Sequence, residues 1–165
     1  VPYKKEIHYR NGDGMLKALS GESVGSHGKY PTAVCCDELH EWNSERAESL
    51  YEALTSGFGN RVSPLVLHIT TAGYGSQPTL AKRLHEKALL FEKGECEDPT
   101  FYGVVYGAEP TDDWRAETTW QKANPSWELV KKNLAREFLL AATEPTEENK
   151  FKRLYLTITI SLHFD

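Results

Sequence analysis

The sequence predicts an α/β protein in which a parallel sheet follows an N-terminal β-hairpin and precedes a C-terminal helical segment. Two apolar runs, residues 32–36 and 64–69, have the unbroken composition of strands that are buried on both faces. A helical pattern follows each run, so strands and helices alternate. Alternation at these lengths is typical of βαβ units, whose strands are parallel.

The composition is that of a globular domain, with 39% hydrophobic and 26% charged residues among 165. No apolar stretch approaches the roughly 18 residues of a membrane span, so we expect no membrane association. The net charge of −5 argues against nucleic-acid binding by bulk charge alone. Cys35, Cys36 and Cys96 form no disulfide framework or CxxC pair, which favours a reducing, cytoplasmic setting.

The first predicted elements are a hairpin and a helix. Asn11-Gly12 and Asp13-Gly14 are turn signals between residues 5–10 and 15–19, and they predict a β-hairpin. Residues 20–31 are rich in Gly and Ser and predict a loop. Asn43 or Ser44 then caps a helix that ends at two glycines, Gly57 and Gly59. Its apolar stripe consists of Ala47, Leu50, Tyr51, Leu54 and Phe58.

Another helix and a further strand are predicted after the second apolar run. Pro78 opens the helix, Gly94 closes it, and residues 101–106 (FYGVVY) predict a third strand of the sheet. The composition changes at residues 107–114, where Pro and acidic residues appear.

The C-terminal part predicts two helices, at residues 128–142 and 147–156, separated by Glu144-Pro145. The final residues alternate apolar and polar side chains like a strand without an evident partner. All four tryptophans are predicted to be packing anchors rather than base-stacking platforms; they are Trp42, Trp114, Trp120 and Trp127.

Polar residues follow both apolar runs at the point where each strand is expected to end. Asp37 and Glu38 follow the first strand, and Thr70, Thr71 and Gly73 follow the second. Parallel strands present their carboxyl ends at one edge, where α/β sheets bind ligands. In a nucleotide-hydrolysing sheet, the first acid would bind Mg²⁺ and the second would position the attacking water. The hydroxyls would sense the γ-phosphate and pass its loss to the next helix.

Asp-Glu after one strand and Thr-Thr-x-Gly after the next is the layout of translocating P-loop ATPases, and residues 37–40 also match the D-E-x-H form of helicases. The sequence resembles a specific family, the large subunit of tailed-phage terminase, which is the ATP-driven motor that packs DNA into capsids. The matching blocks are residues 16–20 with His27-Gly28 and Pro31, 34–42 (VCCDELHEW), 69–73 (ITTAG), 112–114 with Trp120, Lys122 and 123–125, and 149–156 (NKFKRLYL).

The resemblance implies that Asp37 binds Mg²⁺, Glu38 is the catalytic carboxylate, and residues 70–73 couple hydrolysis to movement. It implies ATP as the nucleotide, and double-stranded DNA, the portal and the small terminase subunit as partners in the host cytoplasm. Residues 1–108 would be the C-terminal part of the P-loop ATPase core, and 109–165 a helical linker or lid with an atypical tail.

The sequence also departs from the family. These residues contain no G-x-x-x-x-G-K-[ST] loop, no identifiable upstream arginine and no nuclease domain, and residues 157–165 fit the family poorly. Without the loop, a nucleotide lacks its cradle of backbone N–H groups and lysine. We therefore expect a fragment that is inactive and binds ATP weakly unless the missing Walker A portion of the same protein joins it.

Three other interpretations stay open. One is a helicase-like DExH ATPase fragment. Another is a metal-dependent nuclease that uses Asp37 and Glu38 with Asp112 or Asp113. The third is a non-catalytic assembly fragment that binds through its basic last helix. The six histidines have no HxxxH or HxH spacing, so no zinc site is expected.

Overall fold

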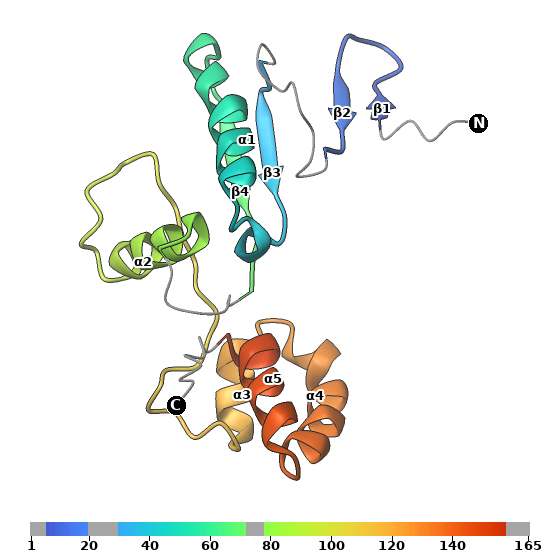
Figure 1. The fold of residues 1–165 in the computed structure, drawn as a ribbon, viewed down its shortest axis with the longest axis vertical. Coiled ribbons are helices and arrows are strands. Elements are labelled where there is room, and N and C mark those ends of the chain that lie inside the picture. The colour runs from blue at the N-terminus through green and yellow to red at the C-terminus, as the bar shows by residue number, and fades with distance from the viewer. Residues whose placement is uncertain (1–5, 20–29, 72–77, 158–165) are drawn as a thin grey trace. The chain divides into compact units, whose positions relative to one another are not determined.

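The computed structural model describes residues 6–19, 30–71 and 78–157 (Figure 1). It is a mixed α/β structure with a small parallel sheet and several helices, as predicted. The chain separates into two compact units, which are described one at a time. The first comprises Val1–Cys36 and Trp42–Leu67, and the second comprises Asp37–Glu41 and His68–Asp165.

The first unit begins with the predicted hairpin. Strands β1 (Glu6–His8) and β2 (Met15–Lys17) pair antiparallel, with Ile7 opposite Leu16. The Tyr9 N–H donates to the Gly14 carbonyl at 2.9 Å and closes the turn. The Asn-Gly and Asp-Gly signals therefore identified this hairpin correctly.

The helix of the first unit also matches its prediction. Helix α1 (Glu45–Thr55) begins after Ser44, whose side chain accepts a hydrogen bond from the Ala47 N–H at 3.3 Å. The 3₁₀ helix η2 (Ser56–Asn60) continues it through the predicted glycines. The buried face of α1 consists of Ala47, Leu50, Ala53 and Leu54.

Strands β3 (Ala33–Cys36) and β4 (Leu65–His68) form the two-stranded sheet (Figure 1). The Leu65 N–H donates to the Thr32 carbonyl at 3.0 Å, where the strands begin. Just past their ends, the Leu39 N–H donates to the Ile69 carbonyl at 3.2 Å. Both segments advance in the same direction between these bonds, as the predicted parallel arrangement requires.

The prediction that both strands are buried on both faces was wrong. Cys36 is fully buried, but Leu65 and Leu67 are 60% and 49% exposed. Ala33 and Cys35 are exposed as well. A strand is buried on both faces only when other layers cover both sides of its sheet. Within the part of the chain that the structure describes, this sheet has two strands and keeps an exposed apolar face.

Helix α2 (Leu80–Glu92) lies in the second unit. Thr79 caps it by accepting from the Lys82 N–H at 3.3 Å, so the helix begins two residues after Pro78. Gly94 follows its end with a φ of +74°, which glycine adopts at little cost. The closing glycine was therefore predicted correctly.

The predicted third strand at residues 101–106 does not form. No strand is found there, and the segment lies extended along α2 with alternating exposure. Gly103 packs so closely that an added Cβ would come within 2.7 Å of the Ala88 Cβ. The Val105 N–H donates to the Glu92 Oε1 at 2.9 Å rather than to a strand. The prediction of a third strand was therefore wrong, because among the described residues no strand pairs with this segment.

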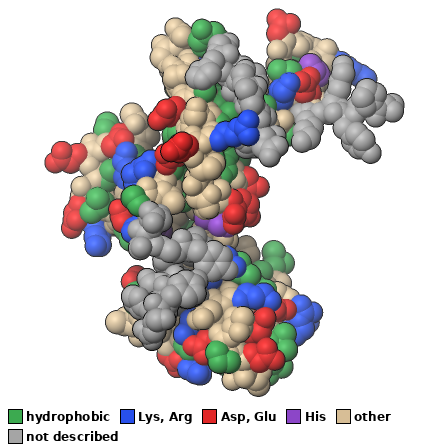
Figure 2. Space-filling view, viewed as in Figure 1, with side chains coloured by type: hydrophobic (Ala, Val, Ile, Leu, Met, Phe, Trp, Pro, Cys, Tyr) green, Lys and Arg blue, Asp and Glu red, His purple; other side chains and the backbone are tan. Residues whose placement is uncertain are grey.

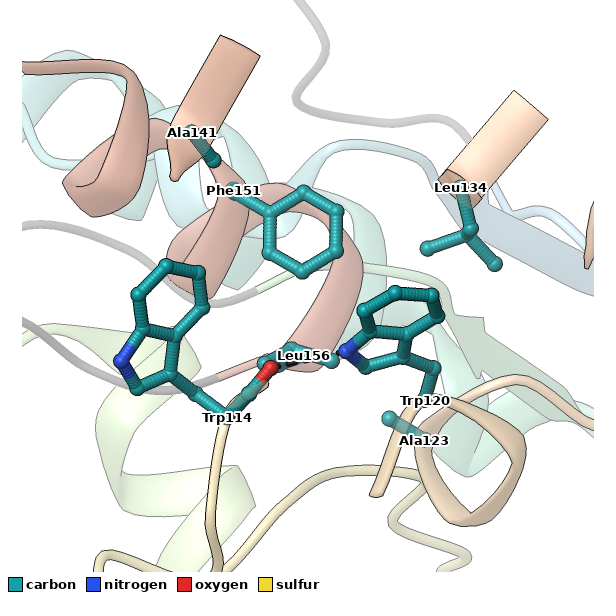
Figure 3. Close-up of a cluster of buried hydrophobic side chains, with 7 residues drawn as sticks. All are labelled: Trp114, Trp120, Ala123, Leu134, Ala141, Phe151 and Leu156. Carbon is teal, nitrogen blue, oxygen red and sulfur yellow. Dashed lines mark hydrogen bonds between the residues drawn. The ribbon is translucent and has the colours of Figure 1, made fainter. Parts of the chain in front are cut away.

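Three helices complete the second unit: α3 (Glu117–Ala123), α4 (Trp127–Ala141) and α5 (Pro145–Leu156). Helices α4 and α5 match the predicted ranges closely, whereas α3 was not predicted. We call these helices, with Trp114, the helical cluster. Its core consists of Trp114, Trp120, Ala123, Leu134, Ala141, Phe151 and Leu156 (Figure 3).

Polar contacts hold this core in register. The Trp120 indole N–H donates to the Trp114 carbonyl at 2.7 Å (Figure 3). The Asn124 amide donates to the carbonyls of Trp120 and Tyr155, each at 2.8 Å. The predicted packing role is confirmed for Trp114 and Trp120. The visible face of the cluster mixes charged and hydrophobic side chains (Figure 2). Among the described residues, no helix has the length and apolar content that crossing a membrane requires.

Candidate functional site

The candidate site is built on a tight turn directly after β3. The 3₁₀ helix η1 (Leu39–Glu41) forms this turn, and the Glu41 N–H donates to the Glu38 carbonyl at 2.9 Å. Glu38 has a φ of +50°, in the left-handed region. That conformation costs a residue other than glycine about 1–2 kcal/mol, so surrounding contacts must hold it.

Leu39 anchors the turn. Its side chain is 1% exposed, and its N–H donates to the Ile69 carbonyl. Helix α2 packs against the same turn. The next N–H, that of His40, donates to the Thr70 Oγ1 at 3.0 Å. Two successive backbone donors thus fasten the turn after β3 to the segment after β4.

The predicted site residues lie close together in this arrangement. Asp37 and Glu38 are exposed on the turn, and Thr70 and Thr71 lie on the segment to which the turn is bonded. The Thr70 hydroxyl donates to the Thr71 carbonyl at 3.0 Å. Gly73 lies outside the described residues. In the contacts described above, the acidic pair is connected to the threonines through Leu39 and His40.

The last residues of β3 and β4 have side chains whose pKa is shifted by burial. Burial, helped by the neighbouring Cys35, raises the pKa of Cys36 from 9.0 to about 11. Burial also lowers the pKa of His68, the last residue of β4, below its usual value. Both shifts favour the neutral form of the buried group.

His40 is the residue to which sequence reasoning assigned no role. Its side chain is only 7% exposed. Its Nδ1 lies 3.0 Å from the Thr70 Oγ1 and 3.4 Å from the Glu38 Oε2, and its Nε2 lies 3.1 Å from the Glu41 Oε1. The one available signal was a histidine three residues after Asp37 in an acidic segment, which the D-E-x-H match contains but does not explain.

The donor set suits a metal ion that arrives with phosphate. Mg²⁺ is usually bound by one or two carboxylates together with substrate phosphates and water. Asp37 supplies one exposed carboxylate, whose Oδ1 accepts from the Glu38 N–H at 3.1 Å. Among the described residues, no group of three or more His, Cys, Asp or Glu side chains could hold a metal ion by itself. Asp37 can therefore supply one of the one or two carboxylates that such an ion needs.

The two other acids considered in the sequence are engaged elsewhere. Asp112 forms an ion pair with Lys122 at 2.8 Å, and this hydrogen bond holds the pKa of Asp112 below its usual value. The Asp113 Oδ1 accepts from the Arg115 N–H at 3.0 Å. These contacts order the loop before α3. They do not support the converging acids that a nuclease site needs.

Comparisons with known proteins agree with the resemblance. The family described as "Terminase large subunit, ATPase domain" matches residues 2–86. Protein YmfN of Escherichia coli strain K12 is 31% identical over 140 residues, which cover 81% of this chain and 29% of that protein. The terminase large subunit of Enterobacteria phage HK97 is 26% identical over 147 residues, which cover 88% of this chain and 28% of that protein.

A solved structure has the same fold. The crystal structure of the HK97 bacteriophage large terminase superposes with a TM-score of 0.71 at 23% identity. The match covers 94% of this chain and 33% of that one. The chain thus spans about a third or less of the length of these relatives.

Proposed function

Because the chain belongs to the terminase large subunit ATPase-domain family, we propose that it carries the hydrolytic acids and coupling segment of a viral DNA-packaging ATPase. The observation that carries the proposal is the bonded pair of segments, in which Leu39 and His40 fasten the acidic turn to Ile69 and Thr70. The whole motor would package double-stranded DNA into procapsids. The portal and the small terminase subunit would be its partners in the host cytoplasm.

The two acids divide the chemistry. Asp37 would hold Mg²⁺, which when bound neutralises phosphate charge. Glu38 projects a carboxylate that is 62% exposed, so it can reach a water molecule above the turn and orient it for attack. Asp37 and Glu38 are adjacent on the turn and both exposed, so each carboxylate can take a different task.

The segment after β4 would couple hydrolysis to motion. Thr70 is bonded to the acidic turn, and Thr71 follows it toward Gly73 and helix α2. A displacement of the turn on phosphate loss would pull on Thr70 and act on α2, which packs against the same turn. Residues 1–108 would then act as part of the ATPase core, with residues 109–165 as its linker or lid.

The phosphate cradle would come from a stretch of the relatives' length that these 165 residues do not span. The isolated chain offers the carboxylates without the lysine and backbone N–H groups of a phosphate-binding loop. It should therefore bind ATP weakly and not hydrolyse it. Titration with a fluorescent ATP analogue and Mg²⁺ tests this, and micromolar affinity for the isolated chain would contradict it.

Catalytic roles require a longer chain in which these residues are joined to a phosphate-binding loop. In that chain, Glu38→Gln should abolish ATP turnover while leaving nucleotide binding intact, because the amide cannot take a proton from water. Glu45→Gln is the matched control, since Glu45 is an exposed acid in the first turn of α1, outside the site. An unchanged rate in the Glu38→Gln variant would remove Glu38 from the mechanism.

A further inference from the structure

The His40 imidazole is the point at which the contacts of the candidate site converge. Its ring is nearly buried, yet three polar groups from two chain segments surround it. Thr70 and Glu38 face Nδ1, and Glu41 faces Nε2. A histidine that only filled space would not need partners on both nitrogens.

The hydrogen bonds of Thr70 bear on whether the His40 Nδ1 donates or accepts a hydrogen bond. A hydroxyl has one proton to donate and two lone pairs with which to accept. The Thr70 hydroxyl donates to the Thr71 carbonyl at 3.0 Å and accepts from the His40 N–H at 3.0 Å. One lone pair is left for Nδ1 at 3.0 Å, so in this arrangement Nδ1 is the donor, whereas a hydroxyl turned toward Nδ1 would give up its bond to Thr71.

This proton has a second acceptor within reach. The Glu38 Oε2 lies 3.4 Å from Nδ1, an ion-pair contact that is longer than the 3.0 Å to the Thr70 Oγ1 and would tighten into a hydrogen bond with a small movement of the carboxylate. We propose that His40 is a positioning residue whose Nδ1–H is shared between Glu38 and Thr70, so that movement of the Glu38 carboxylate changes the hold on Thr70. The role of Glu38 in hydrolysis rests on the proposed function, whereas the shared hydrogen bond does not.

Histidine can be replaced so that one nitrogen at a time is kept. The amide nitrogen of asparagine falls near the place of Nδ1, and that of glutamine falls near Nε2. His40→Asn should therefore preserve the link to Thr70, and His40→Gln should lose it. Thr70→Ser keeps the accepting hydroxyl, and Thr70→Val removes it with little change of shape.

The first measurement uses this chain without nucleotide. Nitrogen-15 NMR of the His40 ring should detect a protonated Nδ1, and its resonance should shift in Thr70→Val and in Glu38→Gln but much less in Thr70→Ser. A thermal melt of each variant shows whether it is folded. If folded Thr70→Val and Glu38→Gln both leave the ring signal unchanged, the shared hydrogen bond is wrong whatever the protein does.

The second measurement uses the longer chain that hydrolyses ATP. His40→Gln should lower kcat about tenfold and leave the KM for ATP unchanged. A tenfold change in rate corresponds to about the free energy of one hydrogen bond. His40→Asn should recover most of the loss, which a general loss of packing would not allow. If Glu38→Gln abolishes turnover but His40→Gln does not lower it, the positioning role fails and the proposed function stands. If Glu38→Gln has no effect, the proposed function fails instead.

Discussion

The helical cluster and the two-stranded sheet differ in how completely they bury their apolar side chains. Leu134 and Leu156 in the cluster are 0% exposed. Leu65 and Leu67 in β4 are 60% and 49% exposed. The same residue type is thus fully enclosed in one region and half open to solvent in the other.

The difference follows from how each region acquires its neighbours. Helices α3, α4 and α5 are consecutive in the chain, so short connections bring their apolar faces together. A parallel sheet needs strands and covering helices from distant segments. The relatives are more than three times as long as the stretches they share with this chain. The cluster thus buries its own apolar faces, whereas covering the exposed face of the sheet requires a layer that the described residues do not supply.

The largest expected effect on stability comes from a substitution that creates a cavity in the core of the helical cluster. Phe151 is 2% exposed. The centroid of its ring lies 5.7 Å from the ring centroid of Trp120 and 6.0 Å from that of Phe138. Phe151→Ala should lower the free energy of unfolding by about 3–5 kcal/mol, because it leaves a cavity among aromatic rings. Urea unfolding followed by tryptophan fluorescence measures the loss. Leu129→Ala, at a residue 86% exposed on α4, should change stability by less than about 0.5 kcal/mol. Equal losses of stability in Phe151→Ala and Leu129→Ala would show that the core of the helical cluster is no more closely packed than its surface.

The buried side of the sheet can be tested through its thiol. Cys36 is 0% exposed with a pKa raised to about 11, so at pH 9 about one per cent of it is thiolate, against half of a thiol at the usual 9.0. In a chain whose other cysteines are Ser, Cys36 should react with iodoacetamide at least about fifty-fold more slowly than an ordinary thiol, and faster as pH rises toward 11. A matched chain that keeps only the exposed Cys35 is the comparison. Similar reaction rates for Cys36 and Cys35 would mean that the Cys36 thiol is accessible to solvent.

Residues 101–106 are an intermediate case, with one side against α2 and one side exposed. Gly103→Ala should cost about 1–3 kcal/mol, because the new methyl would collide with Ala88 and push the segment off the helix. Gly59→Ala is the control, since a Cβ there meets nothing within 4 Å. Thermal melts of both variants decide the point. A loss in the control as large as that of Gly103→Ala would show that α2 does not hold the segment.

The smallest effect is expected on the open face. Leu67→Thr should change stability by less than about 1 kcal/mol and reduce aggregation, because the side chain is half exposed and threonine suits a strand. Leu134→Thr buries a hydroxyl and should cost several times more. A loss for Leu67→Thr as large as that for Leu134→Thr would mean that this chain covers its own sheet.

Local signals predicted local structure well. Ser44 and Gly94 delimit helices where their chemistry suggested, because a cap and a left-handed glycine act within one turn. Helix α3 escaped prediction because it is only two turns long and is held by the burial of Trp120. The burial of the strands was predicted wrongly, because exposure depends on layers that a strand's own sequence does not describe.

The candidate site was predictable in outline but not in its connections. The order of the motifs placed Asp37 and Glu38 near Thr70 and Thr71, since parallel strands end at one edge. No pattern indicated that Glu38 would adopt a positive φ, which glutamate seldom does. The contacts of His40 also went unforeseen, because they join residues 30 positions apart through a turn whose path depends on packing.

The Ala108 N–H donates to the Leu156 carbonyl at 2.9 Å, so the polypeptide enters and leaves the helical cluster at nearly the same place. A module whose two termini adjoin can be grafted into a host loop, or circularly permuted at the α4–α5 connection, without stretching its backbone. A protein engineer can therefore move this module between host proteins as one piece.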